Sequence, residues 1–172
     1  MSYASLPELT LIDENGQNFS SRLKGPGEFQ RPSAPLSSRK AYAAAHVIPL
    51  MGADNTPGAP ASIDWDATLA YRHELWSYGL GVADAMDTAQ RGMGLDYAAT
   101  CELIRRSAIE AAGVLQKNSY PALAGLTVRD ILACGVGTDQ LSADTVQPGQ
   151  LAEVTNAYLE MLCLVEGSGS KA

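Results

Sequence analysis

The stretch AYAAAHVIPL, residues 41–50, decides how the fold is interpreted. It is an apolar run followed by MGADNTP at residues 51–57, where glycine and proline interrupt regular structure. Its alanines would suit a helix equally well, but Pro49 and the glycine- and proline-rich residues behind it argue against extending one. We therefore predict a buried strand that leads into a long loop.

A helix follows this strand and completes a first unit of strand, loop and helix. Asp64 is placed to cap a helix over residues 65–78, and Gly79 is placed to end it. The residues of this segment at helical spacing are Leu69, Arg72, Leu75 and Trp76.

A second unit has the same order. An apolar strand over residues 80–86 leads into the polar loop 87–94, and Asp96 is placed to cap a long helix. The residues predicted to lie on one side of that helix are Tyr97, Cys101, Ile104, Ala108, Ala111 and Leu115.

A third unit consists of a strand over residues 127–134, the loop GVGTDQ at 135–140 and a helix over 150–166. The side chains predicted to face inward from that helix are Leu151, Val154, Tyr158, Met161, Leu162 and Val165. A fourth strand is expected near residues 167–172. Strands that alternate with helices predict an α/β fold with a parallel sheet, whose strands need helices over them and neighbours on both edges.

Residues 1–39 differ from the rest because they are polar and interrupted by glycine and proline. We interpret them as an irregular amino-terminal arm with a short strand at residues 9–12, packing on a later core. Residues 40–172 show no second change of composition and are predicted to form one domain.

Composition limits the possible functions. The 172 residues include 12 basic and 19 acidic side chains, for a net charge of −7, and Lys and Arg do not cluster, so we expect no nucleic-acid partner. Apolar runs are far shorter than the ~20 residues that a membrane span needs, and residues 1–11 lack a basic and then apolar leader. These observations predict a cytoplasmic protein without membrane contact. The three cysteines are widely spaced in apolar contexts, which suits reduced core thiols, and no metal-ligand spacing occurs.

Three segments carry a family resemblance: SRKAYAAAHV at residues 38–47, IDWDATL at 63–69 and AMDTAQRGMGLD at 85–96. They look like an uncharacterised branch of the dihydrodipicolinate synthase family, and the similarity extends over about residues 6–166. The resemblance implies a (β/α)8 TIM barrel with class I aldolase-like chemistry. The chain would supply about three β/α units from the amino-terminal part of that barrel.

Three strand ends resemble motifs of that family, and the first, His46 to Pro49, stands where the family has a proline-containing loop. At the third, CGVGTD at residues 134–139 is similar to the family's Ala-Gly-x-Gly-Ser/Thr-Asn/Asp pattern, and Gly135, Gly137, Thr138 and Asp139 align with it. At the second, MDTAQ at residues 86–90 stands where the family has Gly-Thr-Thr-Gly-Glu. Thr88 is retained from the two threonines that hold a keto-acid carboxylate in the family, and Asp87 replaces the other.

The loop at residues 87–94 is therefore the best candidate for substrate binding. Asp87, Thr88, Gln90 and Arg91 would bind polar groups of a small carbonyl substrate at a strand's carboxyl end. The simpler interpretation is a turn stabilised by its own side chains. Arg91 could pair with a substrate carboxylate or phosphate, or equally with Asp84 or Asp87.

Two further features have both a functional and a structural interpretation. His46 lies in the first apolar run, where it would serve as a catalytic acid–base residue in the barrel interior or as a hydrogen-bonded core residue. Gly135, Gly137 and Thr138 could present backbone amides to an anion or could simply form a tight turn.

The resemblance also implies a Schiff-base lysine on a sixth strand and a tyrosine on a fourth. The lysines present, Lys24, Lys40, Lys117 and Lys171, are not expected at the carboxyl end of a strand. We expect an aldolase-like carbon–carbon lyase acting on a small oxo-acid or sugar-derived carbonyl compound, without a cofactor. It would be inactive until a missing carboxyl-terminal barrel half or a partner chain is added. The alternative is a non-catalytic half-barrel that binds a partner, and the family resemblance suggests a homo-oligomer.

Overall fold

A computed structural model of the 172-residue chain describes residues 8–22, 29–56, 59–86, 91, 94–141, 147 and 149–172. The chain divides into two compact units, residues 1–30 and 31–172.

The first unit contains a β-hairpin. Strand β1 (Glu8–Ile12) pairs antiparallel with β2 (Asn18–Arg22), and the Asp13 carboxylate accepts hydrogen bonds from the backbone in the turn between them. The strand predicted at residues 9–12 is therefore present, whereas β2 was not predicted. Because Leu11 pairs with Phe19, these two side chains share one face of the hairpin, and both are exposed.

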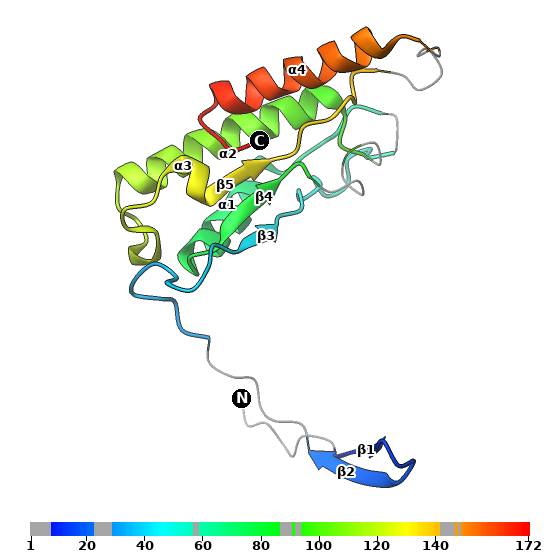
Figure 1. Cartoon of the computed structure of the whole chain (residues 1–172), viewed down its shortest axis with the longest axis vertical. Helices are drawn as coiled ribbons and strands as arrows, with labels where there is room; N and C mark the ends of the chain where they lie inside the picture. Colours follow the sequence, from blue (N-terminus) through cyan, green and yellow to red (C-terminus); the bar gives the residue numbers. More distant parts are fainter. Residues whose placement is uncertain are drawn as a thin grey trace. The chain divides into compact units, whose positions relative to one another are not determined.

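The second unit is built on a parallel sheet in the order β3-β4-β5 (Figure 1). The strands are β3 (Tyr42–Ala44), β4 (Gly81–Asp84) and β5 (Leu132–Cys134). Lys171 forms a parallel bridge with Ala133 on the side of β5 that β4 leaves free. The predicted α/β class is confirmed, and the described strands form a small open sheet rather than a closed barrel.

Helices connect and cover these strands. They are α1 (Trp65–Ser77), α2 (Tyr97–Gln116), the 3₁₀ turn η1 (Pro121–Leu123), the single-turn α3 (Val128–Ile131) and α4 (Leu151–Gly167). Both predicted amino-terminal caps are confirmed. The Asp64 carboxylate accepts from the amide of Ala67 at 2.9 Å, and the Asp96 carboxylate accepts from the amide of Ala99 at 2.8 Å.

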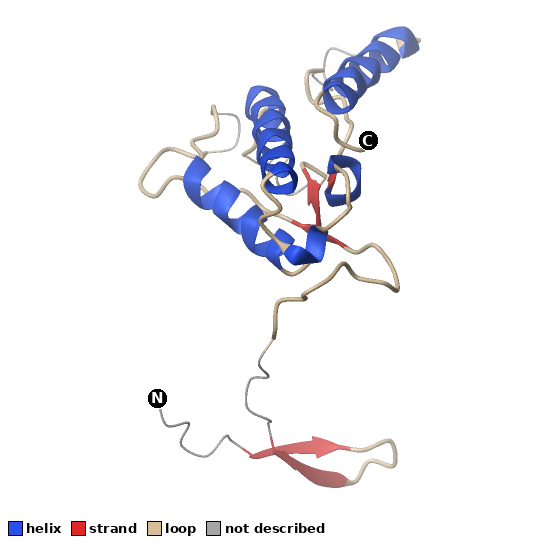
Figure 2. Cartoon of the chain, turned by 90° about the vertical axis from the view of Figure 1, so that its left-hand side faces the viewer, coloured by secondary structure: helices blue, strands red, loops and turns tan. Residues whose placement is uncertain are grey.

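One face of the sheet makes the core. Val82, Leu132 and Cys134 are buried with residues of α1, α2 and α4 in a single cluster. Figure 2 shows α1 and α2 on the same side of the strands. The other face carries a row of residues in register, Ala44, Ala83, Ala133 and Lys171, and Ala44 is exposed.

Two strands are shorter than predicted. The run at residues 41–50 contributes only the three residues of β3, because the carbonyls of Ala45 and His46 accept hydrogen bonds from an arginine of α1 instead of another strand. The segment 127–134 begins as α3, because Thr127 and Asp130 form a reciprocal capping box, and only then becomes β5.

Helix α4 is less buried than predicted. Met161 and Val165 enter the core as expected, but Leu151, Tyr158 and Leu162 are 74%, 48% and 36% exposed. The apolar side of this helix is thus wider than the contact it makes with the described residues.

The capping box predicts a dependence of stability on acid. A hydrogen bond from Lys40 lowers the pKa of the Asp130 carboxyl to about 2, from an ordinary value of 3.8, and hydrogen bonds from Thr127 add to this effect. Because this pKa is lower in the folded state, the stabilisation is present above pH 4 and is lost as the pH falls through about 2. We expect Asp130→Asn to flatten the decline of the unfolding free energy between pH 5 and 2, measured by urea titration. Asp66→Asn on the exposed side of α1 is the matched control, and an unchanged decline in Asp130→Asn would contradict the assignment.

Candidate functional site

The carboxyl ends of β4 and β5 lie side by side. Asp84 and Cys134, the last residues of these strands, are register partners, and the amide of Gly135 donates to the carbonyl of Asp84 at 3.0 Å. The segments that follow each strand therefore begin at the same edge of the sheet. In open parallel α/β sheets and in barrels, this edge is where ligand-binding groups gather.

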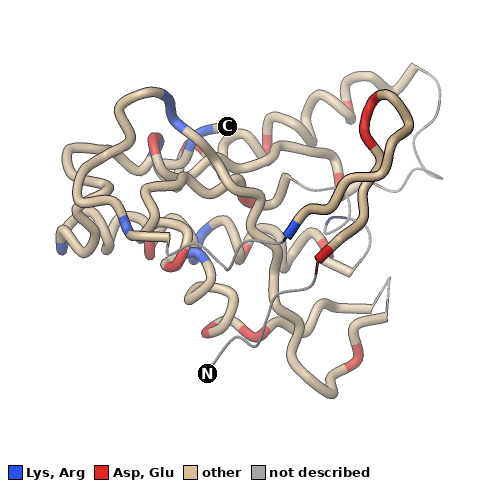
Figure 3. The backbone as a smooth tube through the Cα atoms, turned by 90° about the horizontal axis from the view of Figure 1, so that it is seen from below, with Lys and Arg blue, Asp and Glu red and all other residues tan. Residues whose placement is uncertain are grey.

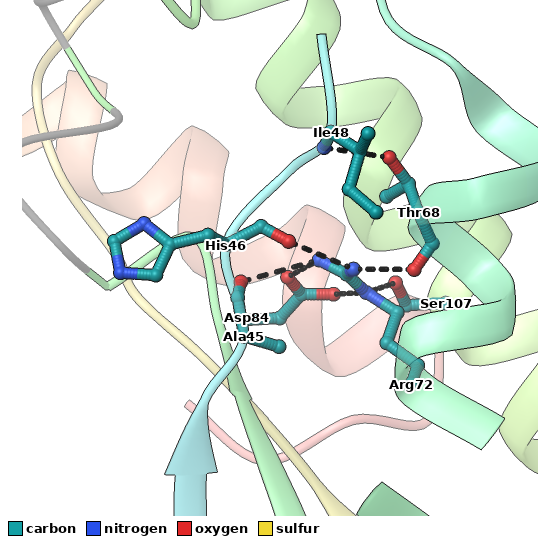
Figure 4. Close-up of polar contacts among 7 residues, drawn as sticks. All are labelled: Ala45, His46, Ile48, Thr68, Arg72, Asp84 and Ser107. Carbon is teal, nitrogen blue, oxygen red and sulfur yellow. Dashed lines mark hydrogen bonds and ion pairs between the residues drawn. The ribbon is translucent and has the colours of Figure 1, made fainter. Parts of the chain in front are cut away.

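A completely buried ion pair lies beneath this edge (Figure 4). Arg72 of α1 binds Asp84 of β4 through two hydrogen bonds, Nη2 to Oδ1 at 2.6 Å and Nε to Oδ2 at 3.1 Å. Nε also donates to Ser107 Oγ of α2 at 3.0 Å, and Nη1 donates to the carbonyl of Thr68 at 2.8 Å. One guanidinium thus connects two helices and a strand.

The same guanidinium holds the chain as it leaves β3. It donates to the carbonyls of Ala45 and His46, each at 3.4 Å, and Thr68 Oγ1 accepts from the amide of Ile48 at 2.9 Å. These contacts replace sheet pairing for the residues after β3. Arg72 is consequently a positioning residue for the loop that follows β3.

A second arginine connects the two loops above the edge. Nη1 of Arg91 donates to the carbonyls of Ala85 at 3.1 Å and Gly135 at 3.0 Å. Its Nε and Nη2 face Asp139 Oδ2 as a hydrogen bond and an ion pair. The predicted pairing of Arg91 with Asp84 is wrong, because Asp84 is occupied by Arg72 and Arg91 pairs with Asp139 from the next loop. The other predicted partner, Asp87, lies outside the described residues.

Close backbone packing accompanies this arginine. Ala85 is buried and has a φ of 49°, a left-handed conformation that is unfavourable for a residue with a side chain. A Cβ atom at Gly135 would lie 2.5 Å from the Ala85 carbonyl oxygen, and one at Gly137 would lie 2.5 Å from Arg91 Nη2. Glycine is therefore required at position 135, where the neighbour is backbone, whereas a side chain at position 137 would displace the Arg91 guanidinium.

These residues line a pocket of about 290 Å³. Its walls are formed by Met86, Arg91, Val136, Gly137, Thr138, Asp139 and Tyr158. Four residues predicted as substrate-binding, Arg91, Gly137, Thr138 and Asp139, therefore share one pocket, and Gly135 contacts it through Arg91. Asp87, Thr88 and Gln90 lie outside the described residues.

His46 is placed differently from the prediction of a barrel-interior side chain. Its imidazole is exposed and points away from the Arg72 network, while its carbonyl oxygen faces that network (Figure 4). The other histidine, His73 of α1, is half-buried and lies 2.9 Å from Glu110 Oε2 and 3.2 Å from the Tyr120 hydroxyl.

The cysteines occupy two kinds of environment. All three are free, and Cys101 and Cys134 are buried, but Cys163 on α4 is exposed and not the core thiol that was predicted. Burial, with the nearby Asp84 charge, raises the pKa of the Cys134 thiol to about 12, so this group is un-ionised and unreactive at neutral pH. Within the described part of the chain, no group of three or more His, Cys, Asp or Glu side chains could hold a metal ion.

Surface charge is mixed along the chain. Figure 3 shows Lys and Arg interspersed with Asp and Glu. Among the residues that the structure describes, no helix combines the length and the apolar character needed to cross a membrane.

The sequence contains a signal for the buried pair of Arg72 and Asp84, which the search for functional motifs does not detect. Arg72 falls among apolar positions of its helix, and Asp84 ends an apolar strand. Charges at two such positions are expected to pair, because an isolated buried charge is too costly. Tyr158 was assigned to the core and instead lines the pocket.

No curated protein matches the chain. One family model, described as "Protein of unknown function (DUF993)", matches residues 9–172. Because the match covers nearly the whole chain, the protein belongs to this family.

Proposed function

We propose that residues 31–172 form part of an aldolase-like carbon–carbon lyase of the dihydrodipicolinate synthase type. Its substrate would be a small oxo-acid or sugar-derived carbonyl compound. The observation that carries the proposal is the pocket at the ends of β4 and β5, where Arg91 and Asp139 from successive loops meet. A purely structural turn does not need an ion pair between two loops beside an open cavity.

The proposal includes further β/α units that complete a barrel. A parallel sheet is normally covered on both faces, yet Ala44 is exposed on the face opposite the helices. The additional units would come from the same polypeptide or from a partner chain. They would supply the lysine amine for an imine with the substrate carbonyl and the neighbouring proton donor.

Trapping with borohydride tests this proposal. The protein is purified from its native source under conditions that retain bound partner chains, then incubated with pyruvate or dihydroxyacetone and reduced. We expect a stable adduct on one lysine by peptide mass spectrometry. If neither pyruvate nor dihydroxyacetone forms an adduct, the imine mechanism is excluded.

A second candidate function is a non-catalytic half-barrel that assembles with other β/α units. It is favoured by the exposed apolar residues of α4, which lie away from its contact with α2. Glu160 binds the hydroxyl of Tyr97, and Tyr158 and Leu162, two residues before and after Glu160, lie on the opposite side of the helix. On this hypothesis Leu162→Lys would abolish self-association measured by light scattering, and an unchanged mass would contradict it.

A further inference from the structure

One nitrogen of the Arg91 guanidinium in the candidate pocket, Nη2, carries two hydrogens, and its ion pair with Asp139 accounts for at most one of them. The side chain of Arg91 is only 9% exposed, and its Nη2 atom is buried without a hydrogen bond among the described residues, although it lies within ion-pair distance of Asp139 Oδ2. Buried donors are nearly always satisfied, because leaving one unpaired costs the loss of its hydration. Since Arg91 lines the pocket, an oxygen atom of a ligand could accept this hydrogen bond.

The charge of Arg91 is already compensated. Asp139 pairs with it, and two backbone carbonyls take both hydrogens of Nη1. An anionic ligand would therefore add a second negative charge next to Asp139 without a free cation to offset it. A neutral oxygen, such as a ketone or a hydroxyl, would accept from Nη2 without that repulsion.

Asp139 offers the complementary group. Both of its contacts with Arg91 use Oδ2, and its side chain is 27% exposed. A carboxylate has about four acceptor sites, so Oδ1 can accept a hydrogen bond from a ligand hydroxyl. Such a bond to an ionised acceptor is stronger than a neutral one.

We propose that the pocket binds a small, uncharged hydroxy-carbonyl compound, a sugar-like molecule of about three to five carbons. An oxygen of this ligand accepts from Arg91 Nη2, and one of its hydroxyl groups donates to Asp139. The pocket volume of about 290 Å³ suits a molecule of this size. The inference rests on the proposed lyase function for its biological role, and it selects the sugar-derived carbonyl compound over the oxo-acid.

Titration by NMR tests this selection on the chain itself, because the residues that form the pocket belong to it. The probes are dihydroxyacetone, acetone, which lacks the hydroxyls, and pyruvate, which carries a carboxylate. Amide shifts of Gly137 and Thr138 report binding. We expect dihydroxyacetone to bind at least about tenfold more tightly than either of the other two, because only it satisfies both groups.

Substitution of Asp139 should reverse the preference. Asp139→Asn keeps the shape but frees the charge of Arg91, so dihydroxyacetone should bind about tenfold more weakly and pyruvate more tightly. Asp66→Asn, on the exposed side of α1, removes a carboxylate away from the pocket and should leave all three affinities unchanged. Dispersed amide signals from residues outside the pocket would show that each variant is folded. Thr138→Val leaves the ion pair of Arg91 and Asp139 intact and provides a second variant of the pocket.

Three outcomes would overturn the inference: pyruvate binding as tightly as dihydroxyacetone to the unmodified chain, no change of preference in Asp139→Asn, or no shift at Gly137 and Thr138 with any probe. The lyase proposal can fail independently of this binding site. If borohydride yields no adduct while dihydroxyacetone still binds at this pocket, the imine chemistry is excluded and the binding site stands.

Discussion

Arg72→Met is expected to lower the free energy of unfolding by about 3–5 kcal/mol, because it leaves the carboxylate of Asp84 buried without a counter-ion. Both side chains of the pair are completely buried, so solvent cannot replace the lost partner. The substitution also removes the donors that hold the carbonyls of Ala45 and His46. Urea unfolding followed by circular dichroism measures the loss.

A control on the same helix separates the effect of burial from that of charge. Arg31 pairs with Glu74 of α1 at 2.8 Å, but their side chains are 59% and 50% exposed. Arg31→Met should lose several times less stability than Arg72→Met, because water and salt screen an exposed pair. Similar losses in the two variants would contradict the role of burial.

The double variant gives a further check. When Asp84 is also replaced, by leucine, no charge remains to be buried, so Arg72→Met with Asp84→Leu should recover a large part of the stability lost in Arg72→Met alone. If the two losses simply add, the residues do not act as a pair.

Local signals in the sequence predicted the helices well. Asp64 and Asp96 each precede an apolar periodic segment, and a cap acts on amides two or three residues away. Helix caps can be predicted from the sequence because the capping residue and the amides that it binds lie within one turn of the chain. Both ends of α1 and the start of α2 accordingly agree with the prediction within one residue.

Strand ends were predicted less well, because distant residues determine them. The apolar run at 41–50 continues past Ala44, but the chain leaves the sheet where Arg72, 26 residues from His46, captures its carbonyls. Thr127 and Asp130 likewise close a helical turn in a segment with the composition of a strand. Hydrophobicity alone does not distinguish these cases.

The candidate site was predicted in its components but not in its pairing. Gly135, Gly137, Thr138 and Asp139 were identified from a motif, and Arg91 from its loop. Their connection depends on a contact between residues 48 positions apart, which no local pattern specifies. The structure shows that the charge of Arg91 is paired with Asp139, whereas one of the two predicted alternatives needed this charge to be free for a substrate carboxylate or phosphate.

Gly135→Ala is expected to cost about 1–3 kcal/mol of stability and to disrupt the pocket. The added Cβ would lie 2.5 Å from the Ala85 carbonyl oxygen and 3.0 Å from Met86 Cα. Both are backbone atoms, which cannot rotate away as a side chain can, and Ala85 already has a strained φ of 49°. Relief requires β4 and β5 to separate at their carboxyl ends, which would also move the carbonyls that orient Arg91.

Gly113→Ala is the matched control for this substitution, because the same methyl group has the opposite effect there. Gly113 lies within α2, and nothing lies within 4 Å of its added Cβ, so the alanine should stabilise the protein by about 0.5–1 kcal/mol through helix propensity. Urea unfolding of the two variants should therefore give changes of opposite sign, and only Gly135→Ala should weaken dihydroxyacetone binding. If both variants gain stability, the close approach of the two strand ends is wrong, and the pocket loses the backbone framework on which its charge-compensated arginine depends.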